Sequence, residues 1–229
     1  MQPAYTAVVV LVKPLLMLAF KRDFRGQDRI PRTGGAILAV NHVSVADPFA
    51  VGLFVHEAGR RPRFMAKASL FRIPIISAIL RGTGQIPVHR YSANARLALT
   101  AAADAVRAGE IVVIYPEGTT TSDPDYWPMR ARTGVARLAL ETGAPVIPVA
   151  QWGPEAFLGR GGRFRPLPRK TLQIRAGAPV ALGTWAGAKM DADTLRACTD
   201  AIMGDITSLV AEIRQQDPPA VAAGTRRTA

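Results

Sequence analysis

The sequence predicts a single-domain α/β protein, with a mostly parallel or mixed sheet flanked by helices and an N-terminal membrane-associating helix. Three observations support this prediction. Short apolar runs alternate with segments whose apolar residues recur at helical spacing, which is the pattern of a sheet covered on both faces. The 229 residues suffice for one sizeable core. A longer apolar segment precedes the first of these runs.

The apolar segment covers residues 4–20, AYTAVVVLVKPLLMLAF. As a helix it would be about 26 Å long, against a hydrocarbon core of about 30 Å, and Lys13 and Pro14 interrupt it. We therefore expect residues 1–23 to form a helix that lies in one leaflet, with a buried core helix as the open alternative. The first six residues lack positive charge and no small-residue cleavage site follows, so we expect no secretory signal.

The remaining elements follow in order along the chain. Apolar runs predict strands at 36–40, 63–66, 84–88, 111–114, 145–150 and 171–176. Helical spacing predicts helices at 48–58, 74–81, 93–107, 134–142 and 192–214. Cys198, the single cysteine, falls on the apolar stripe of the last helix, so we expect it in the core and no intramolecular disulfide. Residues 24–214 would form the domain, and residues 215–229, with paired prolines, a disordered tail.

Basic residues outnumber acidic ones by 29 to 17, a net charge of +12, with the excess concentrated at residues 21–32 and 160–175. Such patches indicate a polyanionic partner (nucleic acid, an anionic membrane surface or a phosphorylated substrate), although basic runs are also common as solvated faces. Phe164 is the only aromatic residue of the second patch, which disfavours nucleic acid. Beside the N-terminal helix, the first patch predicts peripheral or monotopic attachment to the cytoplasmic face of the cell membrane. Three histidines and one cysteine without metal-ligand spacing predict no metal site.

The polar sequence NHVSVAD follows the first of these strands and contains His42 and Asp47. Five residues of helix turn through about 500°, which leaves the two side chains roughly 140° apart, so they can meet only across a turn. Pro48 favours such a turn because it disfavours helix at the preceding residue. The pair could be a general base with its orienting carboxylate, or Asp47 could simply cap the helix at 48–58. Ser44 is a weaker candidate, as a nucleophile.

Two further loops follow predicted strands, where open α/β sheets usually place their sites. GQIPVHR ends in Arg90, and YPEGTTT contains Glu117, Gly118 and Thr119. Taken with NHVSVAD and with VIPVA at 146–150, these motifs stand in an order and spacing that resemble one family over roughly residues 24–150. The chain resembles the glycerolipid acyltransferases, in particular the 1-acylglycerol-3-phosphate (lysophosphatidic acid) acyltransferases.

The resemblance implies transfer of a fatty acyl group from an acyl thioester to lysophosphatidic acid. The thioester would be acyl-CoA or acyl carrier protein as co-substrate, with no other cofactor. His42 would be the general base, and Asp47 would orient and charge-stabilise its imidazole. The acceptor oxygen would attack the thioester directly. Glu117, Gly118 and Thr119 would belong to the acceptor-binding motif.

One departure concerns the phosphate of the acceptor. The family often has arginine where Thr120 stands here, and a hydroxyl cannot replace a bidentate guanidinium. The resemblance makes Arg90 the expected phosphate contact, with Arg130, Arg132 or Lys67 as a second cation. Two alternatives remain open at this point: a different acceptor, such as glycerol 3-phosphate or another lysophospholipid, and hydrolysis of the acyl thioester.

Overall fold

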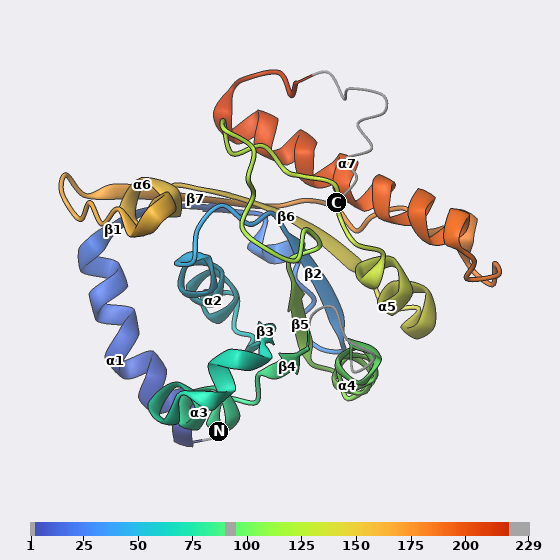
Figure 1. Cartoon of the computed structure of the whole chain (residues 1–229), viewed down its shortest axis with the longest axis horizontal. Coiled ribbons are helices and arrows are strands. Elements are labelled where there is room, and N and C mark those ends of the chain that lie inside the picture. Colours follow the sequence, from blue (N-terminus) through green and yellow to red (C-terminus); the bar gives the residue numbers. More distant parts are fainter. Residues whose placement is uncertain (1–2, 90–94, 220–229) are drawn as a thin grey trace.

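The computed structural model describes residues 3–89 and 95–219, and its centre is a seven-stranded sheet (Figure 1). The strand order is β1-β7-β6-β2-β5-β3-β4. Neighbouring strands are parallel, except that β6 and β7 are antiparallel. The mixed, mostly parallel sheet predicted from the sequence is therefore confirmed. The strands are β1 Phe20–Arg25, β2 Ala36–Val40, β3 Pro62–Lys67, β4 Ile86–Val88, β5 Ile111–Ile114, β6 Val146–Trp152 and β7 Lys170–Ala176.

Helices cover both faces of this sheet (Figure 1). Helices α4, α5 and α7 form one layer, and α1 and α2 lie on the opposite face. Helix α3 packs beside α1, after the short 3₁₀ segment η2, Ala68–Arg72. The helices are α1 Pro3–Ala19, α2 Asp47–Glu57, α3 Pro74–Gly82, α4 Ala95–Arg107, α5 Gly134–Thr142, α6 Pro154–Phe157 and α7 Ala192–Arg214.

The central strand β2 explains why its sequence is continuously apolar. It pairs with β5 on one side and β6 on the other, and all five of its residues are buried. Ile37 and Ala39 pack in the core beneath α4, α5 and α7, whereas Leu38 and Val40 pack in the core beneath α2. Because successive side chains of a strand point to opposite faces, a strand covered twice needs apolar residues at every position.

The predicted strands and helices are all present, with ends that differ by at most two residues. Cys198 is fully buried in α7, as expected. The expected tail begins where α7 ends, and most of it lies outside the described residues. Among the α-helices and strands of the described residues, two were not predicted, the short helix α6 and the edge strand β1, both of which lie in segments without a continuous apolar run.

Strand β1 overlaps the first basic patch, which was expected to lie at the membrane surface. Phe20 and Phe24 pack into the core beneath α2, and Arg22 between them pairs with Glu57 at the end of α2. The carboxylate of Asp23 accepts two hydrogen bonds from the guanidinium of Arg175 on β7, at 2.8 and 3.1 Å. This contact holds the pKa of Asp23 at about 2, and it joins the edge strand to its neighbour.

Residues 3–19 form helix α1, so a helix is present as expected, but it ends before residues 20–23, which belong to β1. The alternative of a buried core helix is wrong, because none of the residues of α1 is buried. The helix rests on α2 and α3 through one side: Leu16 and Ala19 contact the core, and the hydroxyl of Tyr5 lies 3.2 Å from Nδ1 of His56. Its other side exposes a row of large apolar residues, Val10, Leu11, Leu15, Met17 and Leu18. Among the described residues, no helix is long and apolar enough to cross a membrane.

Candidate active site

Two of the polar loops predicted from the sequence, those after β2 and β5, meet at one edge of the sheet. His42 follows β2, Glu117 follows β5, and Lys67 is the last residue of β3. These three strands are parallel neighbours in the order β2-β5-β3, so their carboxyl ends point the same way. Residues far apart in the chain therefore come together there, as in other open α/β sheets.

Hydrogen bonds join Asn41, the residue before His42, to Gln151 on β6. Asn41 is buried; its side-chain oxygen accepts from the backbone N–H of Gln151 at 2.8 Å, and its amide donates to the Gln151 carbonyl at 3.1 Å. The side-chain amide of Gln151 donates in turn to the Asn41 carbonyl at 2.8 Å. Three reciprocal hydrogen bonds thus fix the backbone immediately before His42.

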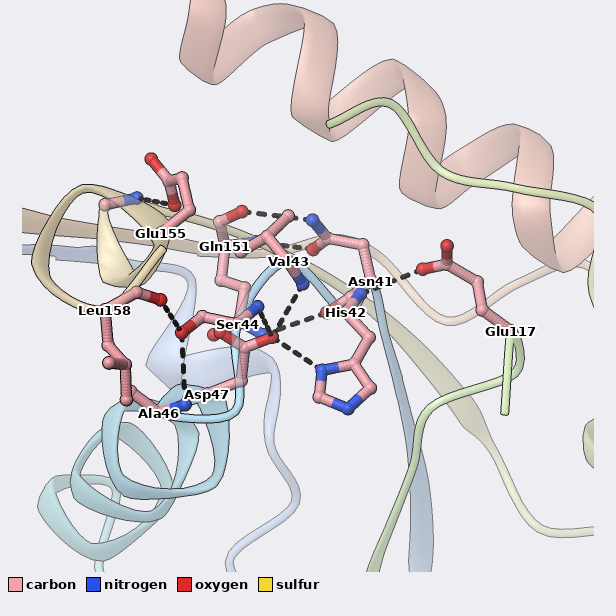
Figure 2. A network of polar contacts seen from close by, with 11 residues as sticks. Asn41, His42, Val43, Ser44, Ala46, Asp47, Glu117, Gln151, Glu155 and Leu158 are labelled. Atoms are coloured by element: carbon pink, nitrogen blue, oxygen red, sulfur yellow. Dashed lines mark hydrogen bonds and ion pairs between the residues drawn. The ribbon is translucent and has the colours of Figure 1, made fainter. Parts of the chain in front are cut away.

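His42 and Asp47 meet across the turn between β2 and α2 (Figure 2). Nδ1 of His42 lies 2.8 Å from Oδ2 of Asp47. The same carboxylate oxygen accepts from the backbone N–H groups of Val43, at 2.7 Å, and Ser44, at 3.0 Å. The contact predicted from the sequence is therefore present.

The alternative, in which Asp47 caps the following helix, is wrong. Asp47 is the first residue of α2 and Ala46 occupies the cap position, with no side-chain cap hydrogen bond. The carboxylate instead points back into the preceding turn, because that turn supplies three donors to a side chain that is otherwise fully buried. Asp47 therefore organises the loop that carries the histidine.

The electrostatics of the pair suit a base. Burial raises the pKa of Asp47, and its hydrogen bonds from His42, Ser44 and Val43 oppose this effect by favouring the ionised form. When Asp47 is ionised it only accepts, so the Nδ1–H of His42 donates to it and Nε2 is the nitrogen left to take a proton from a substrate. The side chain of His42 is 13% exposed, so Nε2 is the part of the dyad that a substrate can reach.

Glu117 holds the backbone of His42 from the neighbouring loop. Its Oε1 accepts from the His42 N–H at 2.8 Å, and its Oε2 accepts from the Met129 N–H at 2.9 Å. The N–H of Thr121 donates to the His42 carbonyl at 2.7 Å. The loop after β5 therefore binds both the N–H and the carbonyl group of His42. An acceptor-binding function for Glu117 stays a prediction, since its two oxygens bind backbone N–H groups here.

Two other acidic side chains belong to the same electrostatic environment. Burial raises the pKa of Glu117 to about 7 and that of Glu155 on α6 to about 7, and the charge of Asp47 contributes to both shifts. Both values lie above the ordinary glutamate value of about 4.3. The contribution of these two groups to the stability of the folded state is fully present below a pH of about 4.3, where they are protonated in both states. It is lost as the pH rises through about 7, the pKa in the folded state.

Of the cations predicted to bind the acceptor phosphate, Arg132 contacts the loop after β5. Gly118 has φ +75°, and a Cβ there would lie 3.0 Å from Nε of Arg132, so the Arg132 side chain lies directly against the PEGT turn. Thr119, Arg130 and Lys67 are exposed. Arg90 lies outside the described residues.

Three residues that the sequence analysis did not assign, or assigned differently, also take part. The hydroxyl of Ser44 donates to the Leu158 carbonyl at 2.6 Å and accepts from the Ala46 N–H, so it supports the turn and is not directed at the imidazole. Tyr115 stacks on His42, with ring centroids 4.2 Å apart. Gln151 clamps Asn41 as described above. The only sequence signal for Tyr115 is its place next to the PEGT motif.

The sequence matches a family model described as acyltransferase over residues 21–152, more than half of the chain. The chain belongs to the acyltransferase family. It is 31% identical over 144 residues to the 1-acyl-sn-glycerol-3-phosphate acyltransferase of Borreliella burgdorferi, covering 62% of this chain and 56% of that protein. The protein of the same name in Bacillus subtilis is 26% identical over 145 residues, covering 63% of this chain and 69% of that one.

This acyltransferase chain spans about half the length of the first curated relatives it matches. A solved structure, the 1-acyl-sn-glycerophosphate (LPA) acyltransferase PlsC from Thermotoga maritima, superimposes with a TM-score of 0.65 over 95% of this chain and 86% of that one. The two sequences are 20% identical, so this likeness shows the fold. Its agreement with the mixed sheet supports the architecture described above.

The bonds of Glu117 predict a large stability loss on truncation. Glu117→Ala leaves the N–H groups of His42 and Met129 without acceptors, at about 1–3 kcal/mol each. We expect thermal unfolding to begin roughly 5 °C or more lower. Glu141→Ala is the matched control, since its carboxylate forms only a surface ion pair with Arg107 and should change stability by less than about 1 kcal/mol. Equal melting temperatures for the two variants would show that Glu117 does not hold the loop.

Proposed function

We propose that this chain is an O-acyltransferase that moves a fatty acyl group from an acyl thioester to the free hydroxyl of lysophosphatidic acid. The product would be phosphatidic acid, a precursor in phospholipid synthesis. The observation that carries the proposal is the imidazole of His42, bound through Nδ1 to a buried carboxylate at the carboxyl edge of the sheet. The curated relatives named 1-acyl-sn-glycerol-3-phosphate acyltransferases support this choice of acceptor.

The arrangement of the dyad suggests how the reaction proceeds. Nε2 of His42 takes the proton of the acceptor hydroxyl while its oxygen attacks the thioester carbonyl carbon. The new C–O bond forms, the C–S bond breaks, and the proton passes from the imidazolium to the departing thiolate. Asp47 stabilises the imidazolium charge while the proton resides there.

Direct attack is favoured over a covalent acyl-enzyme because neither candidate nucleophile is available to the imidazole. The Ser44 hydroxyl donates to the Leu158 carbonyl. The thiol of Cys198 is buried in α7, and burial raises its pKa, which lowers its nucleophilicity at neutral pH. Neither group presents its proton to the imidazole of His42, which would have to remove it to activate the nucleophile.

The phosphate of the acceptor needs cations near the PEGT turn. Arg132 already lies against Gly118, two residues before Thr120, the position where the family often has arginine. We assign Arg132 as one phosphate contact and keep Arg90 as the expected second contact. Glycerol 3-phosphate or another lysophospholipid is the alternative acceptor, because the cation set differs from the family pattern.

The decisive test is the purified protein assayed with an acyl thioester, with and without lysophosphatidic acid. We expect thiol release only when lysophosphatidic acid is present. We expect His42→Ala to lower turnover by about 10² to 10⁴ without unfolding the protein. His56→Ala is the control, because that histidine contacts Tyr5 on α1 and not the site. Equal thiol release without acceptor would indicate a hydrolase. If His42→Ala kept more than a tenth of wild-type turnover, His42 would not be the general base.

The assignment of Arg132 predicts a selective kinetic effect. Arg132→Ala should raise KM for lysophosphatidic acid about tenfold, which corresponds to about 1.4 kcal/mol, while KM for the thioester changes less than about twofold. Arg107→Ala, on the far end of α4, is the control and should change neither value. Thr120→Arg should be tolerated. An increase confined to KM for the thioester would show that Arg132 contacts the donor instead.

The proposal includes attachment to the cytoplasmic face of the cell membrane, as a peripheral or monotopic protein. Helices α1 and α3 pack side by side, and both expose large apolar residues, among them Leu11, Leu18 and Ile75. A hollow of about 460 Å³ beside α3 is lined by Arg63, Arg72 and Arg81, among others. Apolar side chains next to guanidinium groups suit acyl chains next to anionic headgroups.

The exposed row of α1 predicts how this attachment can be removed. Leu11→Asp with Leu18→Asp should weaken binding to vesicles of phosphatidylcholine and phosphatidylglycerol by tenfold or more, because each buried leucine contributes about 1.5–3 kcal/mol. Flotation of the vesicles measures this. Leu97→Asp, at a similarly exposed position on α4, should bind like the wild type. Complete release of the unaltered protein by high salt would show that charge alone holds it, since salt does not screen apolar burial.

A further inference from the structure

Tyr115 lies against the face of the catalytic imidazole. It follows the last residue of β5, and its ring stacks on that of His42 with centroids 4.2 Å apart and planes at 21°. The ring of Phe64, on β3, stacks on Tyr115 in turn at 6.4 Å and 13°. Asp47 therefore fixes one edge of the imidazole, and Tyr115 fixes one of its faces.

The buried polar atoms around this stack show an unusual coincidence. Within residues 3–89 and 95–219, three buried side-chain atoms lack a hydrogen-bond partner: Oδ1 of Asp47, the hydroxyl of Tyr115 and Oε1 of Gln151. All three belong to side chains that touch His42 or the backbone next to it. Unpaired buried polar atoms are rare in folded proteins, so three of them at one site call for an explanation.

Only one of the three atoms can donate. Ionised Asp47 and the oxygen of Gln151 are acceptors, and the amide of Gln151 is already bonded to the Asn41 carbonyl. The Tyr115 hydroxyl has no hydrogen-bond partner, and the charge of Asp47 and the side chain of Gln151 both affect its pKa. Burial raises the pKa of Tyr115 well above its ordinary value, so the hydroxyl keeps its proton to offer to these acceptors.

We infer that Tyr115 is a positioning residue of the acyl-transfer reaction: its stacked ring holds the imidazole of His42 in plane, and its buried hydroxyl supports the ring in that position. This inference rests on the proposed function of His42 as general base. Tyr115 touches no reacting atom and acts through the histidine. It thereby couples the loop after β5 to the ring, whereas Glu117 couples that loop to the backbone.

Two substitutions separate the ring from the hydroxyl. Tyr115→Leu removes both and should lower kcat about 10²-fold, because a catalytic group displaced by an ångström commonly loses that much, while both KM values stay within about threefold. Tyr115→Phe keeps the stacked ring and should restore most of this loss, leaving kcat about threefold to tenfold below the wild type. Phe54→Leu, which shortens a buried aromatic residue on α2, is the control for lost packing and should leave kcat unchanged.

Each outcome of these assays either supports or contradicts the positioning role of Tyr115. The expected order of kcat, with unchanged KM, supports the inference. If Tyr115→Leu keeps kcat within twofold of the wild type, or if the loss falls on KM, Tyr115 does not position the base. If Tyr115→Phe is as slow as Tyr115→Leu, the ring contributes nothing and the inference fails in its stated form.

A measurement without substrate separates this inference from the proposed function. In ¹⁵N-labelled protein, the Nδ1–H proton of His42 should give an exchange-protected NMR signal, assigned by its loss in His42→Ala. We expect this signal in the wild type and in Tyr115→Phe, and its broadening or loss in Tyr115→Leu. An unchanged signal in Tyr115→Leu overturns the inference whatever the enzyme assay shows. Absence of acyl transfer by the wild type, with the signal behaving as expected, would overturn the proposed function alone.

Discussion

The buried carboxylate of Asp47 is the constraint on which the rest of the site depends. A charged group without water is costly unless donors surround it, and here one oxygen receives three hydrogen bonds. Two of these donors are backbone N–H groups, so the chain after β2 must fold back over the carboxylate. The third donor is the imidazole of His42, whose orientation and tautomer are fixed by the same requirement. The turn, the base and its charge partner therefore form together.

The histidine is also held from two strands that are distant in sequence. Asn41 exchanges hydrogen bonds with Gln151 on β6, and the loop after β5 binds both backbone groups of His42 through Glu117 and Thr121. These contacts need β5, β2 and β6 to be neighbours in parallel, which is the order observed. His42 is thus held by Asp47, by β6 through Asn41, and by the loop after β5. A base held in this way loses little orientational freedom when a substrate binds, which favours reaction.

The excess positive charge proves to be partly structural. In the first basic patch, Arg22 pairs with Glu57 of α2 and Asp23 pairs with Arg175 of β7. In the second patch, Arg169 donates to backbone carbonyls at the end of α1 and the start of β1, and Arg160 donates to the loop after β5. Net charge therefore overstates the number of cations available to a partner. Of the arginines that line the hollow beside α3, Arg63 pairs with Glu110, so Arg72 and Arg81 are the ones that the proposed membrane attachment would use.

The sequence by itself determined most of the strands and helices, because their periodicities are local properties of the chain. It left the NHVSVAD turn open between a dyad and a helix cap, and the resemblance to the acyltransferases favoured the dyad. The contact between His42 and Asp47 could be predicted since the residues between them close a single turn. Strand β1 could not, because its stability comes from pairing with β7, which lies about 150 residues away in the chain. The same holds for Glu117, Tyr115 and Gln151, whose functions at the histidine arise from strand order. Local patterns encode each strand and loop, whereas long-range hydrogen bonding and packing decide which loops meet.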